Sequence, residues 1–300
     1  MSFRFGIVTM TNASLEEQRA RWRLVEELGF DQLFVGDISH MYGTVEVEGK
    51  LRFTATDETC FEAWSMLADM ARITERVRIG TLVSSPVLRG PALLAMQAAA
   101  VDQLSGGRLE LGIGLGVAYD HPVMGVEHWR WPERAERFRE YVALVDRLLS
   151  SRDGPVEFEG RHYQTSQPAL NPGALQRPRP RLHTAGQSGT AVRVAAELAD
   201  VWHGPSRLGD SIDDAFERLG QRSQQLDRHC EKKQRDPATV CRALDMTRTL
   251  SPWQHPDAFE KLVTRFAELG FREFVADWPA ESSMHLLEHI GTHVIPSLRP

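Results

Sequence analysis

VRIGTLVSSPVLRGPALLAMQAAAVDQLSGGRLELGIGLG, residues 77–116, sets the architecture of the chain. The β-branched run at 77–83 predicts a strand. Residues 91–104 predict an apolar helix that begins with a proline suited to a first helical position. SGGR (105–108) ends that helix, because its glycines can adopt the left-handed conformation of a C-cap. A second strand opens 109–116, so the spacing indicates a βαβ unit with parallel strands.

The same alternation of strand and helix continues along the rest of the chain. Predicted strands occupy residues 3–10, 30–37, 77–83, 109–116, 181–189, 200–205, 239–250 and 271–279. Predicted helices occupy residues 14–29, 60–74, 91–104, 133–151, 190–199, 211–233, 255–270 and 282–298. Eight such units without a reversal favour a closed (β/α)8 barrel over an open doubly wound sheet. We therefore expect a single barrel domain over residues 1–300.

Two segments interrupt this alternation. Residues 38–59 are long and lack helical periodicity, and loops of that length in compact domains are usually functional or mobile. Residues 153–180 are rich in proline and glycine and contain VEFEGRHY, a short β excursion. Because the α/β alternation resumes afterwards, we interpret this second segment as an insertion off the barrel.

Composition narrows the classes of partner and compartment. The formal net charge of −6 gives no indication of a nucleic-acid partner. No apolar run approaches the roughly 18 residues that a membrane span requires, and the N-terminus does not resemble a secretory signal. The three cysteines are widely spaced and fit neither a disulfide framework nor a zinc site, which favours a reducing cytoplasm. The histidines show no convincing metal-ligand spacing, so no metal site is expected.

Residues suited to ligand binding gather where the predicted strands end, the edge at which parallel α/β folds bind ligands. The glycines at 112, 114 and 116 would let a flat ring lie against the strand ends, or would allow tight packing at a barrel mouth. TLVSSP (81–86) could form a bulge in which Ser84 or Ser85 hydrogen-bonds a ligand. Neither serine lies in a GxSxG elbow, which argues against a serine hydrolase.

A second candidate is AGQSG (185–189), between a predicted strand and the helix that begins at Thr190. Consecutive backbone N–H groups at a helix N-terminus, with the hydroxyls of Ser188 and Thr190, suit a phosphate group. The alternative interpretation is an ordinary βα turn with an N-cap. A third group of polar residues is predicted on the same rim: Asp37, His40, Tyr42, Tyr119, Asp120, His121 and His183.

At these residues the chain resembles the bacterial luciferase-like flavin-dependent oxidoreductases. The similarity is spread over nearly the whole length and includes EELGFDQLFVGD (26–37), EAWSMLADMARITERVRIGTLV (62–83), RGPALLAMQAAAVDQLSGGRLELGIGLG (89–116), FEGRHY (158–163) and AGQSGTAVRVAAELADVW (185–202). The resemblance implies a (β/α)8 barrel that binds a flavin or a deazaflavin at the carboxyl ends of its strands.

The resemblance also implies roles for individual residues. A non-prolyl cis peptide at Leu82–Val83 would lie under the cofactor ring, beside Gly114. Asp37, His40, Ser84 and Tyr119 would surround the ring or the ribityl chain. The cofactor phosphate would lie on the loop formed by Gly186, Gln187, Ser188, Gly189 and Thr190. Residues 38–59 and 153–180 would form the lid and the substrate wall at the C-terminal face of the barrel.

Within the resembled family, two features lean towards FMN rather than the deazaflavin coenzyme F420. AGQSG and the alanine-rich helix after it look like the FMN monooxygenase branch, and Ile38 stands where many deazaflavin members have histidine. The resemblance then implies oxidation of a small organic substrate by O2 and reduced FMN, which a separate flavin reductase supplies, in a homodimer. His40 would protonate or stabilise the flavin peroxide, with His121 or His183 as substitutes.

Two alternatives remain open at this point. The first is an F420-dependent oxidoreductase that transfers hydride. The second is a non-catalytic flavin-binding protein, which would be expected to lack parts of the lid and of the phosphate loop.

Overall fold

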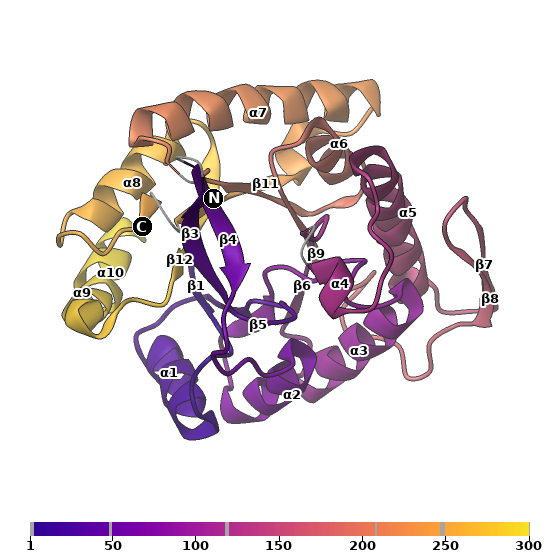
Figure 1. Cartoon of the computed structure of the whole chain (residues 1–300), viewed down its shortest axis with the longest axis horizontal. Coiled ribbons are helices and arrows are strands. Elements are labelled where there is room, and N and C mark those ends of the chain that lie inside the picture. The colour runs from indigo at the N-terminus through magenta and orange to yellow at the C-terminus, as the bar shows by residue number, and fades with distance from the viewer. Residues whose placement is uncertain (1–2, 48–49, 118–119, 208, 247–249, 300) are drawn as a thin grey trace.

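The computed structural model describes residues 3–47, 50–117, 120–207, 209–246 and 250–299. A closed barrel of eight parallel strands forms its centre (Figure 1), as the sequence predicts. Its strands are β1 (Arg4–Thr9), β2 (Gln32–Val35), β5 (Arg78–Thr81), β6 (Leu109–Ile113), β9 (Arg181–Ala185), β10 (Val201–Pro205), β11 (Cys241–Met246) and β12 (Phe271–Asp277). The order around the barrel is β1-β12-β11-β10-β9-β6-β5-β2.

A ring of helices surrounds the barrel (Figure 1). These are α1 (Leu15–Glu27), α2 (Ala63–Ile73), α3 (Pro91–Leu104), α5 (Trp131–Ser150), α6 (Gly189–Leu198), α7 (Ile212–Lys232), α8 (Ala258–Ala267), α9 (Met284–His289) and α10 (Ile295–Leu298). The predicted helix at 282–298 is divided, because a π-helical turn at Ile290–Val294 joins α9 to α10. Among the helices described, none is both long and apolar enough to cross a bilayer.

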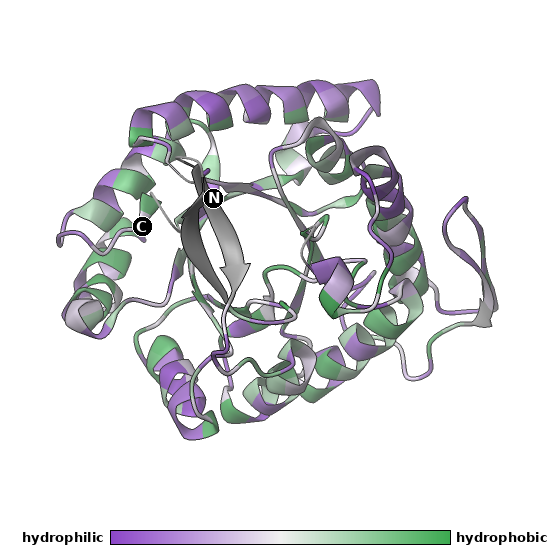
Figure 2. Cartoon of the chain, viewed as in Figure 1, coloured by the Kyte–Doolittle hydropathy of each residue, from purple (hydrophilic) through white to green (hydrophobic). Residues whose placement is uncertain are grey.

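Hydropathy separates the inner and outer faces of the helical ring. Figure 2 shows α7 predominantly hydrophilic along its length, with hydrophobic positions interspersed. The buried positions of α7 include Leu219 and Leu226, which belong to the large apolar core. Ser211 forms a capping box with Asp214 at the start of this helix, which satisfies N–H groups that the helix itself leaves without acceptors.

Residues 38–59 form more regular structure than the sequence analysis expects. An antiparallel hairpin, β3 (Tyr42–Val47) with β4 (Lys50–Ala55), occupies most of the segment. The sequences of β3 and β4 alternate apolar and polar residues, and this period of two suits strands rather than helices. The side chain of Tyr42 lies outside the described residues. The hairpin follows β2, on the carboxyl side of the barrel.

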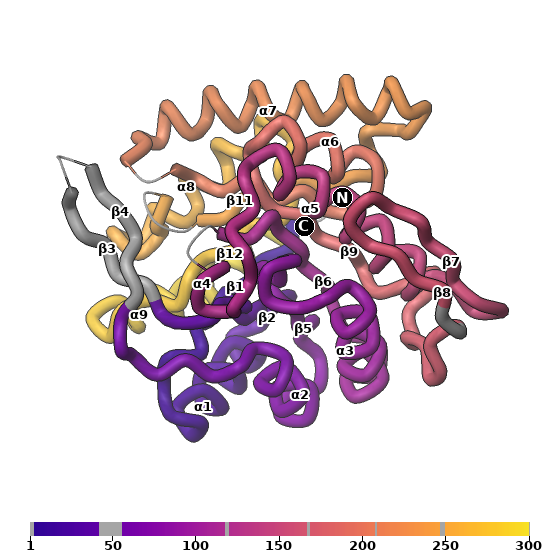
Figure 3. Tube along the Cα trace, turned by 45° about the vertical axis from the view of Figure 1, so that its right-hand side comes forward, coloured from indigo at the N-terminus to yellow at the C-terminus, as the bar shows by residue number. Residues whose placement is uncertain are grey.

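The insertion at 153–180 does not stand at the C-terminal face, so its predicted place as a substrate wall is wrong. Its hairpin, β7 (Pro155–Glu159) with β8 (Gln164–Pro168), projects outside the helical ring (Figures 1 and 3). Helix α5 runs back to the amino ends of the strands before the hairpin begins, which explains this position. Carboxylates on the outer helices hold the segment: Glu140 accepts N–H groups of residues 161–163, and Asp102 accepts those of residues 175–176.

Alternate residues of each barrel strand point into the barrel, in three layers. The layer at the amino ends is charged and polar: Arg4, Gln32, Arg78, Glu110, Arg181 and Glu273. The middle layer contains Phe34, His183 and His203, whose rings meet edge to face or at a tilt. The layer at the carboxyl ends includes Val8, Gly114, Asp245 and Asp277. This last layer is the floor of the candidate site.

Candidate functional site

A buried ion pair joins the carboxyl end of β2 to the chain beyond β5. Asp37 is 5% exposed and accepts hydrogen bonds from both terminal nitrogens of Arg89. Arg89 also donates to Glu62, the residue that caps α2, at 3.1 Å. Asp37 is therefore already paired within the protein. It shapes the rim of the mouth rather than presenting a bare carboxylate to a ligand.

Ser84 lies at the centre of the same network. Its hydroxyl donates to Asp37 and accepts the indole N–H of Trp64 at 3.1 Å. Its backbone N–H donates to the carbonyl of Gly112 on β6 at 2.9 Å, and its carbonyl accepts the N–H of Gly114, just beyond β6, at 2.8 Å. The Leu82–Val83 peptide immediately before Ser84 is cis, as the family resemblance implies. Ser84 is thus held on every side, and Val83 is the half-buried residue that follows the cis bond.

The glycines at the end of β6 serve close packing between strands. A Cβ atom on Gly112 would collide with the carbonyl oxygen of Thr81, and one on Gly114 would collide with the Val83 side chain. The interpretation as tight packing at a barrel mouth therefore accounts for these glycines. Gly114 leaves room for the Val83 side chain. It therefore influences a bound ring only by allowing Val83 to lie where it does.

His40 is brought to the rim by a short chain of hydrogen bonds. Its Nδ1 lies 2.8 Å from the hydroxyl of Ser39, and that hydroxyl donates to Asp120 at 2.7 Å. Since the single hydroxyl proton of Ser39 points to Asp120, Nδ1 of His40 must carry the proton of the other bond. In the tautomer that carries this proton on Nδ1, Nε2 is the acceptor nitrogen of the ring. Tyr119, the predicted neighbour of this group, lies outside the described residues.

His121 is placed differently from His40. Its ring is fully buried and packs edge to face on Trp129, with centroids 5.0 Å apart, and against His128 at 5.3 Å. The short helix α4 (Asp120–Val123) carries both Asp120 and His121, but only Asp120 has a described contact with Ser39. His121 is thus fully buried among aromatic rings, whereas His40 is half-buried on the rim.

The AGQSG loop has the geometry expected of a helix N-terminus that could bind an anion. Ser188 caps α6 by accepting the N–H of Ala191 at 3.1 Å, and Gly186 has a φ of +131° that favours glycine. In the described part of the chain, the N–H groups of Gly189 and Thr190 have no acceptor. Two first-turn donors and the positive end of the helix dipole thus face outward together.

Basic residues of α7 flank this loop, and the sequence analysis did not single them out. Arg218 donates to the side-chain oxygen of Gln187 at 2.6 Å and pairs with Asp210. One turn later, Arg222 donates to Gln225 at 2.6 Å, and Gln225 approaches Gly189. Arg218 and Arg222 stand four residues apart, so both lie on one face of the helix. This four-residue spacing of two arginines is the pattern by which the sequence could have indicated them.

The described residues fit a flavin-type cofactor at this edge. Ser85 is 3% exposed, and in the described part of the chain its hydroxyl has no hydrogen-bond partner. A buried hydroxyl of this kind is normally satisfied by a protein group, water or a ligand. Ser85 lies beside Gly116 at the end of β6. It would hold a polar edge of the ring system, Val83 would contact its face, and the α6 loop with Arg222 would hold a phosphate.

His183 is not on the rim, contrary to the sequence prediction. It lies in the middle of β9, points into the barrel and is fully buried, because the strand continues two residues beyond it. With Glu110 and Glu273 it forms a group spaced closely enough to hold a metal ion. The oxygens of both glutamates, however, already accept from Gln32 and from arginines at positions 4, 78 and 181. We interpret the group as an ion-pair network rather than a metal centre.

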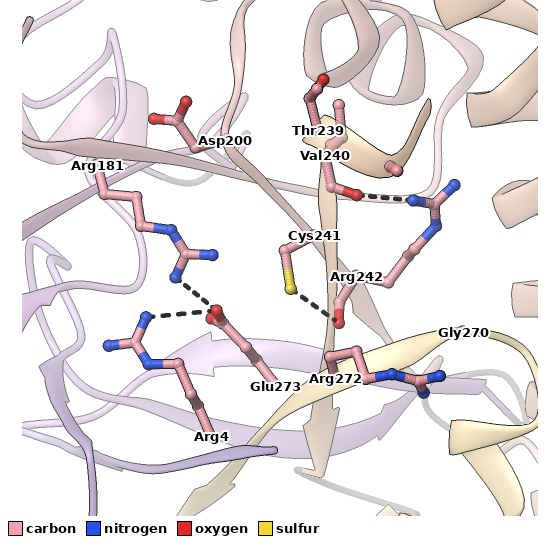
Figure 4. Close-up of a pocket in the computed structure, with 11 residues that line it drawn as sticks. Arg4, Arg181, Asp200, Thr239, Val240, Cys241, Arg242, Gly270, Arg272 and Glu273 are labelled. Carbon is pink, nitrogen blue, oxygen red and sulfur yellow. Dashed lines mark hydrogen bonds and ion pairs between the residues drawn. The ribbon is translucent and has the colours of Figure 1, made fainter. Parts of the chain in front are cut away.

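This network borders a cavity of about 520 Å³ at the amino ends of the strands. Figure 4 shows Arg4 and Arg181 both directed at Glu273, with Cys241 beside them on β11 and its sulfur directed at the carbonyl of Arg242. Burial raises the pKa of Cys241 to about 12, so this thiol stays protonated at neutral pH. The cavity is on the opposite side of the barrel from Asp37 and Ser84, and it does not belong to the candidate site.

Comparisons with known proteins show relatives over nearly the whole chain. The chain is 27% identical to an F420-dependent glucose-6-phosphate dehydrogenase of Intrasporangium calvum, over 91% of this chain and 92% of that protein. Its fold matches an F420-dependent secondary alcohol dehydrogenase with a TM-score of 0.80 at 18% identity, over the whole of both chains. It also matches a monooxygenase of Streptomyces bottropensis with a TM-score of 0.74 at 18% identity, over 98% and 99% of the two chains.

A family model assigns the chain as a whole. The model described as luciferase-like monooxygenase matches residues 1–272 of the 300. The closed barrel, the cis peptide at the predicted position and the relatives over the full length all accord with that match. The chain therefore belongs to the luciferase-like monooxygenase family and is an oxidoreductase.

Proposed function

We propose that this protein is an F420-dependent oxidoreductase that transfers hydride between the deazaflavin and a small alcohol or carbonyl substrate. The observation that carries the proposal is the His40–Ser39–Asp120 chain at the carboxyl ends of the strands. Oxidation of an alcohol releases a hydride from carbon and a proton from oxygen. In the tautomer that this chain of hydrogen bonds sets, Nε2 of His40 is the acceptor nitrogen of the ring, and we assign it as the base for that proton.

The relatives support F420 rather than FMN, against the lean of the sequence analysis. Several relatives of similar identity carry F420-dependent names, among them the dehydrogenase of Intrasporangium calvum and, at 31% identity over 67% of this chain, a protein of Mycobacterium tuberculosis named as a putative F420-dependent oxidoreductase. The absence of histidine at Ile38 weighs less than expected, because His40 supplies an imidazole two residues further on. The likeness in fold to monooxygenases does not discriminate between the two cofactors.

Each part of the site has a task in this proposal. A bound deazaflavin would supply the hydride acceptor or donor. The Asp37–Arg89 pair fixes the rim, and Ser84 locks the end of β5 to β6 beneath it. The α6 loop and Arg222 bind the anionic part of the cofactor. His40 takes the hydroxyl proton and becomes an imidazolium. Asp120, acting through Ser39, stabilises that imidazolium.

FMN-dependent oxygenation is the second candidate, and the observation that favours it is the AGQSG loop with the alanine-rich helix after it, which resembles the FMN monooxygenase branch. Under that alternative a flavin reductase would have to deliver reduced FMN, and O2 would be a substrate. The two candidates differ in what the protein binds, so a binding measurement separates them.

The test is a titration of the purified protein with F420, FMN and anaerobically reduced FMN, followed by fluorescence. The proposal expects saturable binding of F420 at concentrations at which neither form of FMN binds. R222Q should weaken F420 binding. The control is R228Q, which replaces an exposed arginine six residues further along the same helix and should leave F420 binding unchanged. Binding of reduced FMN with no response to F420 would replace this proposal with the monooxygenase.

A further inference from the structure

Three histidines recur at a spacing of four residues near the C-terminus, in HLLEHIGTH (285–293). On a helix, residues at i and i+4 share one face, and helical zinc motifs use this spacing for a pair of histidine ligands. The stretch begins on α9 and continues into the π-helical turn, in the outer ring of helices (Figure 1). The sequence analysis did not single it out.

The core fixes which side of this stretch faces outward. Ile290 and Val294 are buried and belong to the large apolar core. Gly291 lies so close to the C-terminal end of α1 that a Cβ atom added to it would collide with that helix. On the opposite side, His289 is half-buried and His293 is exposed. The two rings therefore lie on an outer surface that the packing beneath them holds in place.

The π-helical turn aligns His289 with His293. In an α-helix, residues i and i+4 are rotated by about 40° about the axis, because four residues exceed one turn of 3.6. A π-helical turn is wider, with i→i+5 hydrogen bonds, so it removes most of this rotation. The two rings stack, with centroids 5.0 Å apart and planes at 20°. In the described part of the chain, no ring packs against His285, so the aligned pair is His289 with His293.

A hydrogen-bond chain sets the tautomer of His293. The hydroxyl of Thr292 donates to the carbonyl of Glu288 at 2.7 Å, and a carbonyl can only accept. The same hydroxyl oxygen lies 2.8 Å from Nδ1 of His293. Because the hydroxyl proton of Thr292 points to Glu288, the proton of this second bond comes from Nδ1. In that tautomer, Nε2 of His293 carries the lone pair and points away from the hydrogen-bonded edge.

This arrangement has the form of a metal-ligand histidine. A ligating imidazole binds the ion through one nitrogen and donates the N–H of the other to a protein oxygen, which fixes the ring. Imidazole suits Zn²⁺, Ni²⁺ and Cu²⁺, whereas Mg²⁺ and Ca²⁺ take oxygen ligands. Rotation about their side-chain bonds can bring Nε2 of both rings to about 2.1 Å from a single ion.

We propose that His289 and His293 form a binding site for a late first-row divalent cation, with Zn²⁺ and Ni²⁺ as its probes. Nε2 of each ring is a ligand, water completes the coordination, and Thr292 is the positioning residue for His293. The two ligands lie at either end of one π-helical turn, so the bound ion clamps that turn. The site lies outside the candidate cofactor site, and the proposal does not depend on the proposed function.

The first test is a calorimetric titration of the purified full-length protein with Ni²⁺, and with Mg²⁺ as the control ion. H289Q and H293Q should each weaken Ni²⁺ binding at least tenfold, because each removes one of two ligands. H285Q is the matched control: it replaces an exposed histidine four residues before His289 and should change the affinity less than twofold. Wild-type affinity in H293Q, or an equal loss in H285Q, would overturn the proposed pair.

The second test reads the rings themselves in protein labelled with 15N in histidine. Without metal, His293 should be a neutral ring protonated at Nδ1. Ni²⁺ below one equivalent should broaden the signals of His289 and His293 before those of the other histidines. Broadening that begins at other histidines would refute the site.

T292V tests the positioning role of Thr292, because it keeps the branched shape and removes the hydroxyl. It should populate the tautomer of His293 protonated at Nε2 and weaken Ni²⁺ binding by about 10–100-fold, the usual cost of losing such a partner. An unchanged tautomer together with unchanged Ni²⁺ affinity would show that Thr292 does not position the ring.

The clamp is tested by thermal unfolding with Zn²⁺. An ion that binds the folded chain alone stabilises it, so Zn²⁺ at about 100 times its Kd should raise Tm of the wild-type protein. H293Q should lose this rise, and H285Q should keep it. An equal rise in H293Q and in the wild type would contradict a clamp at this turn.

Discussion

The carboxylate of Asp37 and the guanidinium of Arg89 form a bidentate pair at the mouth of the barrel, with side chains that are 3% and 8% exposed. Removing one partner from a buried pair leaves an uncompensated charge, which typically costs about 3–5 kcal/mol. We therefore expect R89M to lower the free energy of unfolding by an amount in that range. Urea denaturation measures it.

A double-mutant cycle provides the control for this pair. D37N combined with R89M removes both charges, so the double variant should be more stable than R89M alone. R72A, which removes the exposed partner of Asp69, should change stability by less than about 1 kcal/mol. Additive effects of D37N and R89M would show that the two residues are not coupled.

His40 is the second point at which the account can be tested. H40N removes the basic nitrogen while keeping a polar side chain, and loss of a general base typically slows turnover by about 10²–10⁴-fold. We expect kcat with F420 to fall by that order and the Kd for F420 to stay within a factor of about two. S39A, which disconnects His40 from Asp120, should cause a smaller loss and shift the pH profile of kcat. An H40N variant with wild-type kcat would exclude His40 as the base.

Ser188 allows a test of the α6 loop that does not depend on activity. S188A removes the cap that accepts the N–H of Ala191, which should cost about 1 kcal/mol of stability. S188D should preserve the cap but place a negative charge where an anion is proposed to bind. We expect S188D to fold as the wild type does and to lose F420 binding at least tenfold. Unchanged F420 binding in S188D would place the phosphate elsewhere.

Glu26 links stability to pH. Burial raises the pKa of Glu26. Hydrogen bonds from the backbone N–H groups of Val77, Arg76 and Glu75 lower it by a larger amount, so the net shift is downward. A carboxylate whose folded pKa is depressed stabilises the protein above its unfolded pKa, about 4.3, and this contribution is lost as pH falls through the lower folded pKa. E26Q should therefore be less stable than the wild type at pH 7.

The pH dependence supplies the discriminating readout for Glu26. The difference in unfolding free energy between E26Q and the wild type should shrink as pH falls from about 4.3 through the lower folded pKa, below which the carboxyl group is protonated in both states. The exposed neighbour variant E27Q should show little difference at any pH. A deficit in E26Q that does not change with pH would mean that the charge of Glu26 plays no part.

The barrel could be predicted from the sequence because its signals are local and repeated. Each strand is a short β-branched run, and each helix carries its own cap and apolar stripe, as 77–116 illustrates. The hairpin of 42–55 could also have been found, because its residues alternate with a period of two. To predict where residues 153–180 lie, one must know that α5 returns the chain to the amino ends of the strands. That return is a property of the closed barrel and not of the segment itself.

The candidate site was predictable only in part. Asp37, His40 and Ser84 follow strands directly, so their position on the rim could be expected. Their partners come from distant segments: Arg89 follows β5 and Asp120 follows β6. Which partner a side chain selects depends on how neighbouring strands close around the barrel. His183 shows the same limit, because the strand predicted at 181–189 did not define where the strand ends, and only the structure places His183 in the middle of β9.

Hydride transfer between a substrate carbon and F420 tests the central claim most directly. Purified protein would be mixed anaerobically with F420 and a panel of secondary alcohols and sugar phosphates deuterated at the carbinol carbon. The account predicts that at least one of them reduces F420 without O2, with deuterium recovered in the reduced cofactor and the reaction lost in H40N. Failure of the whole panel with F420, together with O2-dependent oxidation driven by reduced FMN, would contradict it.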